Sequence, residues 1–285
     1  MRQTIPLPDG KKICAIFGVA YEAFTKSGKF KNDPEIKVNF TGLSHSHYGG
    51  RVGVWRLMEL FDRHGGKGSF VTNGLAVKLW PEAAKAIVAA GHEMAGHGWT
   101  NEVPMYKMTP EEERTDVKNT TEIIEKTTGK RPVGWASPGN MYTAHTLNII
   151  AENGYTWSGD PIDDDNPYVV TVNGGKNKLC VVPKFNYAND FRAWGGGMMC
   201  GDDFYLGWRT TFDYLVEEAM RGKTGTLSVV CHAELGGRPH MAYAVSKMLR
   251  TCKEYSDLVW NPTRSELAAH CLKHAKSAEA FVPAP

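Results

Sequence analysis

Short apolar runs alternate with longer amphipathic segments along the whole chain, and this alternation constrains the fold more than any other feature of the sequence. Apolar runs of a few residues, bounded by turn residues, predict buried strands of a parallel sheet. The expected strands are Ile13–Val19, Gly68–Thr72, Glu93–Ala95, Gly134–Ala136, Leu179–Val182 and Leu227–Cys231. Strands that alternate with helices over this length favour a (β/α) barrel or a doubly wound sheet.

The segments between the strands carry helix signals. Val52–His64 has an apolar face and is followed by Gly65, a typical helix stop. Thr109, Pro110 and Glu112 match an N-cap, a proline in the first turn and the acid of a capping box. Further helices are expected over Thr143–Asn153, Thr211–Arg221, Ala242–Tyr255 and Arg264–Lys273. Because no linker or repeat interrupts the pattern, residues 1–285 are predicted to form a single domain.

Composition excludes several classes of function. The chain has 33 Lys and Arg against 31 Asp and Glu, and a net charge of +2 is too small for a nucleic-acid footprint. No apolar stretch reaches the roughly 18 residues needed to span a bilayer, and the N-terminus lacks a signal-peptide core. Six cysteines without a C-x-x-C pair indicate neither a zinc ribbon nor a redox motif. We therefore expect a cytoplasmic protein with a small-molecule substrate and no nucleic-acid or membrane partner.

Three reactive side chains follow expected strands. In parallel α/β folds, catalytic residues gather at the carboxyl ends of the strands. Glu22 is a candidate general base, metal ligand or orienting acceptor, although a solvated loop glutamate is an equal alternative. His97 lies between two glycines, and its alternative is a buried, hydrogen-bonded histidine. His232 could protonate a leaving nitrogen, or it could pack beneath a loop.

Other polar residues support weaker hypotheses. His92 begins a strand and should therefore lie at the opposite end of the barrel as a structural residue. His45 and His47 have a spacing that would place both on one side of an extended segment as metal ligands, but polar loop histidines are common. Arg51 follows two glycines and is a candidate for gripping an anionic or carbonyl group of the substrate, or a surface arginine.

Three stretches, GHEMAGHGWTN, TPEEERTDVKNTTEIIEKTTGKRPVGWASPGN and VVCHAELGGRPH, resemble the polysaccharide deacetylase (NodB-like) family in order and spacing. The resemblance implies an α/β fold, a distorted (β/α) barrel of the NodB type in one domain. Members of the family cleave carbon–nitrogen or ester bonds, commonly N-acetyl groups on sugars. They use a divalent metal held by one aspartate and two histidines.

The chain departs from this family pattern at the metal site. Ala20 and Glu22 stand where the family has two aspartates, one acting as base and one binding metal. Asn101 replaces the second histidine of the H-x-x-x-H motif that begins at His97. A neutral amide oxygen is a much poorer zinc ligand than imidazole. The family's RxP-type motif reads Ala136-Ser137-Pro138-Gly139.

These departures, together with HYGGRVGVWRLMELFDRHG, are similar to the branch of the family that contains metal-independent allantoinase and cyclic imide hydrolases. The resemblance implies a homo-oligomer that opens a cyclic amide, imide or ureide without a cofactor or essential metal. The implied catalytic residues are Glu22, His97 and His232, and the implied substrate-binding residues are Tyr21, Arg51, Trp99, Asn101 and Ser137.

Two alternatives remain at this point. The first is a metal-dependent N-deacetylase of an acetylated sugar or polysaccharide, with zinc held by Glu22, His97 and one of His45, His47 or Asn101. The second is a catalytically silent carbohydrate-binding barrel, which the replacement of the usual acid by Ala20 would favour. Three titratable groups at three strand ends argue against a silent scaffold.

Overall fold

Ten strands form one sheet in the computed structural model, which describes residues 2, 4–27, 37–184, 188–195, 197 and 200–282. The strands are β1 (Ile13–Tyr21), β2 (Gly68–Thr72), β3 (Glu93–Gly96), β4 (Gly134–Trp135), β5 (Trp157–Ser158), β6 (Tyr168–Val172), β7 (Asn177–Val181), β8 (Gly225–His232), β9 (Val259–Trp260) and β10 (Glu279–Ala280). Their order is β10-β6-β7-β5-β4-β3-β2-β1-β8, and β9 pairs with β1. All pairings are parallel except that of β6 with β7. The six expected strands are present, within two residues at each end.

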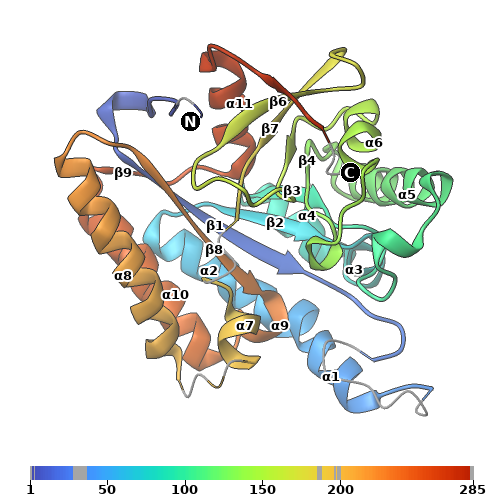
Figure 1. Ribbon diagram of the computed structural model, residues 1–285. Coiled ribbons are helices and arrows are strands. Elements are labelled where there is room, and N and C mark those ends of the chain that lie inside the picture. Colours follow the sequence, from blue (N-terminus) through green and yellow to red (C-terminus); the bar gives the residue numbers. More distant parts are fainter. Residues whose placement is uncertain are drawn as a thin grey trace.

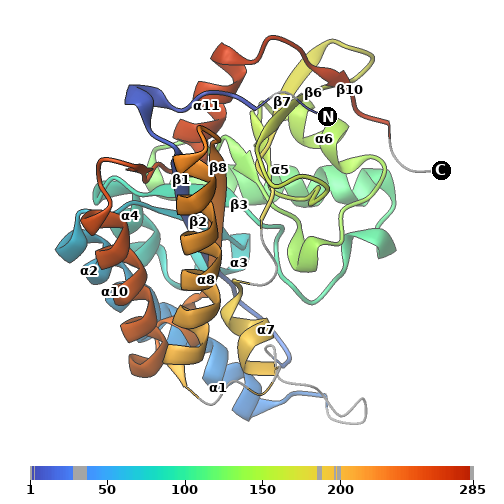
Figure 2. The same ribbon diagram turned by 60° about the vertical axis from the view of Figure 1, so that its left-hand side comes forward.

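Helices surround this sheet (Figures 1 and 2). They are α1 (Phe40–Tyr48), α2 (Val54–His64), α3 (Gly74–Leu79), α4 (Pro81–Ala89), α5 (Pro110–Thr128), α6 (Thr146–Glu152), α7 (Asp190–Gly195), α8 (Gly201–Met220), α9 (Ala233–Gly236), α10 (Pro239–Glu254) and α11 (Arg264–His274). Helices α2, α8 and α10 pack together beside β1 and β8, whereas α11 packs against β5, β6 and β7. In the described part of the chain, no helix is long and apolar enough to cross a membrane.

The two faces of β1 have different roles. Side chains alternate between the faces of a strand. One set contributes to the large core that includes α2, α8 and α10, and it comprises Ile13, Ala15, Phe17, Val19 and Tyr21. On the opposite face, Cys14, Ile16 and Ala20 pack in a second cluster with Leu267 and Ala268 of α11. The sheet therefore curls around an interior that α11 fills from one side, and Glu22 follows the inward set.

Two expectations about secondary structure need correction. His45 and His47 lie in α1, not in an extended segment. On a helix, residues two apart point in different directions, so the basis for a shared metal site is lost. Helix α8 begins at Gly201, ten residues before the expected Thr211, because the apolar pattern of its first half is diluted by polar residues. A five-residue π-helical turn, Gly49–Gly53, also precedes α2.

Helix α5 tests the expected capping box directly. The Thr109 side chain accepts a hydrogen bond from the Glu112 N–H, and the Glu112 carboxylate accepts one from the Thr109 N–H. We expect Thr109→Ala to lower the free energy of unfolding by about 1 kcal/mol, because the Glu112 N–H at the helix start loses its acceptor. Thr115→Ala, an exposed substitution in the same helix, is the matched control and should change it by less than about 0.5 kcal/mol. Equal urea midpoints for the two variants would contradict this account.

Candidate active site

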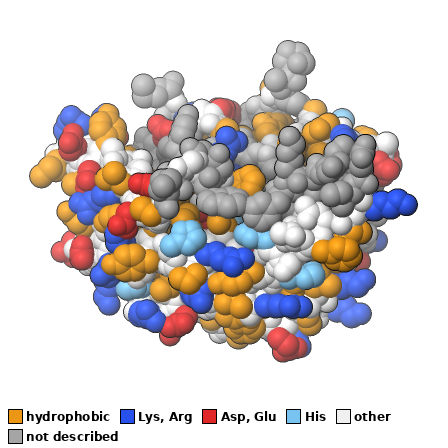
Figure 3. Space-filling model, turned by 90° about the horizontal axis from the view of Figure 1, so that it is seen from below, with side chains coloured by type: hydrophobic (Ala, Val, Ile, Leu, Met, Phe, Trp, Pro, Cys, Tyr) orange, Lys and Arg blue, Asp and Glu red, His pale blue; other side chains and the backbone are white. Residues whose placement is uncertain are grey.

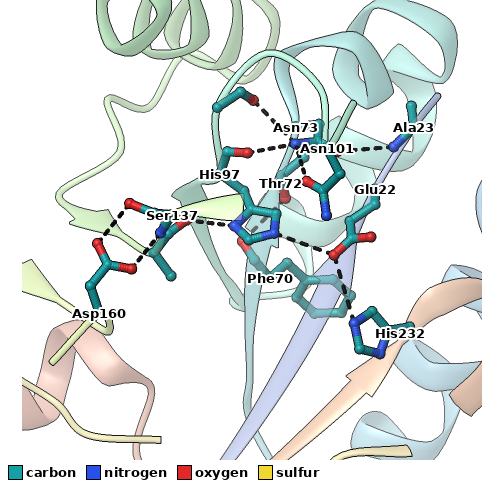
Figure 4. A network of polar contacts seen from close by, with 12 residues as sticks. Glu22, Ala23, Phe70, Thr72, Asn73, His97, Asn101, Ser137, Asp160 and His232 are labelled. Atoms are coloured by element: carbon teal, nitrogen blue, oxygen red, sulfur yellow. Dashed lines mark hydrogen bonds and ion pairs between the residues drawn. The ribbon is translucent and has the colours of Figure 1, made fainter. Parts of the chain in front are cut away.

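The register of four neighbouring strands brings distant polar groups to one edge of the sheet. Tyr21 of β1 pairs with Thr72 of β2, Thr72 pairs with Gly96 of β3, and Gly96 pairs with Trp135 of β4. The next residue on each strand is therefore at the same level, and these residues are Glu22, Asn73, His97 and Ala136. On the other side of β1, Ala20 pairs with His232, the last residue of β8. Figure 4 shows Glu22, Asn73, His97 and His232 close together.

Glu22 lies between two imidazole rings. Its Oε1 is 3.3 Å from Nε2 of His97 and 3.7 Å from Nε2 of His232. The three residues are 2%, 4% and 7% exposed, respectively, so the group is shielded from bulk water. Charges and hydrogen bonds act more strongly in such an environment than at the surface.

The partners of the Nδ1 atoms fix how both rings are oriented. Nδ1 of His97 lies 2.5 Å from the carbonyl oxygen of Ala136, which can only accept, so Nδ1 carries a proton. Nδ1 of His232 lies 2.6 Å from Oδ1 of Asp190. In a neutral ring the Nε2 atom then carries a lone pair, which would face the Glu22 carboxylate oxygen. A hydrogen bond in either pair therefore requires a proton on the carboxylate or on an Nε2 atom.

Asp190 is a site residue that the sequence analysis missed. It is fully buried at the start of α7, and its Oδ2 accepts a hydrogen bond from the backbone N–H of His232 at 2.7 Å. The carboxylate thus holds both the ring and the backbone of His232. The two residues are 42 positions apart, and nothing in the local sequence around Asp190 indicates this contact.

Asn73 is a second site residue that the sequence analysis did not identify, and its side chain connects three loops by hydrogen bonds. Its Oδ1 accepts from the Ala23 N–H at 3.1 Å, and its Nδ2 donates to the carbonyl oxygen of His97 at 2.5 Å. The same Nδ2 lies 3.1 Å from Oδ1 of Asn101. This one buried side chain therefore fixes the backbone on both sides of the Glu22 and His97 pair (Figure 4).

Ser137 supports the site from behind. Its backbone N–H and its hydroxyl donate to the two carboxylate oxygens of Asp160, at 2.6 and 2.8 Å. Burial raises the pKa of Asp160, whereas the hydrogen bonds from Ser137 oppose this shift. Because Ala136 holds Nδ1 of His97, the Ser137 and Asp160 pair fixes the loop that orients this ring.

A cavity of about 720 Å³ opens beside these groups. Its lining includes Glu22, His97 and His232 and, of the five expected substrate-binding residues, Asn101. Other lining residues include Gly18, Ala20, Val71, Lys184, Arg192, Val230 and Arg264. Figure 3 shows the molecule from the side where β1 ends, and histidine and basic side chains are exposed there among apolar ones.

The other expected substrate-binding residues lie outside this lining. Tyr21 points to the outer face of β1, where its ring lies 6.2 Å from that of Trp80. Trp99 packs over Gly74 and lines a separate hollow with Asp116. Ser137 is buried behind the site. Tyr21 and Ser137 are therefore placed to support the site, not to touch a molecule in the cavity.

The structure also separates the segment around α1 from the cavity lining. Arg51 is exposed on the π-helical turn. The His47 ring packs edge-on against Trp80, with 5.5 Å between centroids, and Nδ1 of His45 lies 3.4 Å from Nη2 of Arg238. His92 is buried at the opposite end of the strands, between Phe61 and Phe70. Burial lowers the pKa of His92, as expected for a structural histidine.

The donor set does not fit the family's metal triad. The amide oxygen of Asn101 already accepts from Asn73, and an amide is a weak zinc ligand in any case. Within the described ranges, no group of three or more His, Cys, Asp or Glu side chains is arranged to hold a metal ion. We therefore derive no reaction step through a metal.

Comparisons with known proteins find relatives with a similar sequence and a similar fold. A family model described as polysaccharide deacetylase matches residues 48–158. The peptidoglycan deacetylase of Helicobacter pylori is 23% identical over 261 residues, which cover 81% of this chain and 87% of that protein. The peptidoglycan deacetylase-like protein FGM2 of Gibberella zeae is 26% identical over 79% of this chain and 77% of its own length. The crystal structure of PuuE allantoinase is 26% identical, covers 97% of this chain and 96% of its own, and superposes with a TM-score of 0.87.

The fold and the strand-end site resemble those of deacetylase- and allantoinase-like hydrolases, whose members act on non-peptide C–N bonds. The chain is similar to polysaccharide deacetylases of the NodB type over residues 48–158, and PuuE allantoinase is among its structural neighbours. The expected α/β fold of the distorted barrel type is confirmed by this likeness, although the hydrogen-bonded strand order of the described residues is open between β8 and β10.

Asp116 makes a loop next to the site sensitive to pH. Both of its carboxylate oxygens accept from the Trp99 N–H, and burial raises the pKa of Asp116 to about 6 from an ordinary 3.8. Between these values the folded state binds the additional proton, so stability falls as the pH rises from about 4 to about 6. We expect Asp116→Asn to remove this loss, which amounts to up to about 3 kcal/mol. The pH dependence is measured as the difference between urea midpoints at pH 4.5 and pH 7. Glu122→Gln, an exposed substitution on the same helix, is the control. If Asp116→Asn showed the same difference as the parent protein, the assignment would be contradicted.

Proposed function

We propose that this protein hydrolyses the ring of a cyclic amide, imide or ureide without an essential metal. The observation that carries the proposal is the position of Glu22 Oε1 between the Nε2 atoms of His97 and His232. A base, an orienting group and an acid are thereby held at one end of the cavity. An activated ring carbonyl needs less polarisation than an acetamide, which makes a metal dispensable.

The proposed reaction uses one proton cycle. The Glu22 carboxylate accepts a proton from a water molecule as the water oxygen attacks the ring carbonyl carbon. His97, fixed through Ala136, orients the water or polarises the carbonyl. The carbon–nitrogen bond then breaks as protonated His232 gives its Nε2 proton to the leaving ring nitrogen. Because Glu22 Oε1 and His232 Nε2 are 3.7 Å apart, the proton taken from water can return to His232.

Asp190 suits His232 to the role of acid. A carboxylate that accepts from Nδ1 fixes the ring and keeps Nε2 directed at the cavity. The similarity to PuuE allantoinase supports a ring substrate. The similarity to peptidoglycan deacetylases supports the alternative, an acetylated sugar, which would have to be cleaved with the same three groups. The homo-oligomer implied by the family branch stays a prediction.

A panel of ring substrates tests the proposal. Purified protein treated with a chelator should open at least one of hydantoin, dihydrouracil, succinimide, maleimide and allantoin, measured by loss of ultraviolet absorbance or by release of the ring-opened acid. Untreated protein is the control, and the two rates should agree within about twofold, because no step requires a metal. Stoichiometric zinc with reversible loss of activity on chelation would refute the metal-free mechanism. Turnover of an N-acetylated sugar alone would favour the deacetylase.

Substitutions at the central carboxylate test its role. Glu22→Gln keeps the shape but cannot accept the water proton, and His232→Ala removes the acid. We expect each to lower kcat by at least about 100-fold with little effect on the unfolding midpoint. Exposed Glu59→Gln is the matched control for the glutamate substitution and should retain the parent rate. Near-normal rates in either site variant would remove that residue from the mechanism.

A further inference from the structure

Arg264 is a buried arginine that lines the cavity below the catalytic group. It is the first residue of α11 and is 1% exposed. Its Nε and Nη2 atoms are buried and have no hydrogen-bond partner among the described residues. Its guanidinium faces the Trp157 ring, with 5.7 Å from Cζ to the ring centroid. A buried guanidinium with unfilled donors is costly, so its presence requires an explanation.

The acid that acts on Arg264 electrostatically does not fill these donors. This acid is Glu93, and neither Nε nor Nη2 of Arg264 has a hydrogen-bond partner among the described residues. The Glu93 oxygens are occupied by other donors, namely the Ser69 hydroxyl, the Trp157 indole N–H and the backbone and hydroxyl of Ser265. Burial lowers the pKa of Arg264 to about 10, so the guanidinium is still charged at neutral pH.

The inward face of β1 leaves open space between Arg264 and the reacting groups. Gly18, Ala20 and Glu22 share this face and all line the cavity. A Cβ atom at Gly18 would lie 2.9 Å from Nη2 of Arg264, so glycine is what allows the guanidinium to lie against the strand. Glu22 is four positions beyond Gly18, which corresponds to roughly 13 Å along a parallel strand. The pocket therefore has a catalytic end and a cationic end, with small side chains between them.

We propose that Arg264 binds a carboxylate of the substrate and thereby selects acidic ring compounds. This inference rests on the proposed function and names its substrate class: a cyclic amide or ureide with a carboxylate a few bonds from the ring. Guanidinium presents parallel donors that match the two oxygens of a carboxylate. Lys184 and Arg192 also line the cavity and add to its positive potential. With the carboxylate at Arg264, the ring carbonyl reaches the level of Glu22.

A matched pair of substrates tests the selection. Hydantoin with a 2-carboxyethyl group at C5 and the corresponding primary amide have nearly the same size and differ in charge. We expect the parent protein to favour the acid by roughly 10- to 100-fold in kcat/KM, the range for one charge-assisted contact. Arg264→Met should reduce this preference to within about threefold, chiefly by raising KM for the acid, while turnover of the amide stays within threefold. Arg264→Lys keeps the charge without the paired donors and should give an intermediate preference.

Arg51→Met is the control, since Arg51 is an exposed arginine outside the cavity lining. It should keep the full preference for the acid. Loss of the preference in Arg51→Met, or its retention in Arg264→Met with an unchanged unfolding midpoint, would overturn the assignment. The same holds if the parent protein does not distinguish the acid from the amide.

Direct binding separates this inference from the proposed function. Glutarate, a dicarboxylate that contains no ring to open, should bind the parent protein in calorimetry and bind Arg264→Met at least about 10-fold more weakly. If no ring is opened but this difference is found, the proposed reaction fails and the carboxylate site stands. If ring compounds are opened but glutarate binds both proteins equally or neither, the reaction stands and the role of Arg264 is refuted.

Discussion

One carboxylate oxygen between two imidazole nitrogens is the interaction on which the site depends. Glu22 Oε1 can face both Nε2 atoms because each ring is turned by an acceptor at its Nδ1, the Ala136 carbonyl in one case and Asp190 in the other. These acceptors come from different strands and helices than the rings that they hold. The pair of rings and the carboxylate are therefore positioned by the barrel as a whole, and shielding from water strengthens each contact.

Because side chains alternate between the two faces of a strand, β1 contributes both to the hydrophobic core and to the lining of the cavity. On β1, the outward residues Phe17 and Val19 pack into the helix-covered core, while the inward residues Gly18 and Ala20 are small and line the cavity. A larger inward side chain would fill the space that a substrate needs, and an outward deletion would leave a void in the core. The two demands fall on alternate positions and do not compete.

At the position of the second histidine of the family pattern, this chain has an amide that takes part in a hydrogen-bonded loop. Where the family pattern has a second histidine, Asn101 accepts from Asn73, which also holds the Ala23 amide and the His97 carbonyl. The position thus contributes to the rigidity of three strand-end loops. This arrangement is consistent with a reaction that relies on the placement of protons at Glu22, His97 and His232.

The sequence by itself determined six of the ten described strands within two residues, the capping box of α5 and the strand-end positions of Glu22, His97 and His232, because local periodicity and turn residues encode them. It did not predict β6, which pairs with β7 in the antiparallel direction, or the two-residue strands β5, β9 and β10. The pairing of these strands depends on distant segments. It also predicted Tyr21 and Arg51 as substrate-binding residues, whereas the structure places both outside the cavity lining. Proximity along the chain does not tell which face a side chain occupies. Only the tertiary structure brought in Asp190, Asn73 and Arg264. Their partners lie many residues away, and contacts at that separation are set by strand register and packing, which no local pattern records.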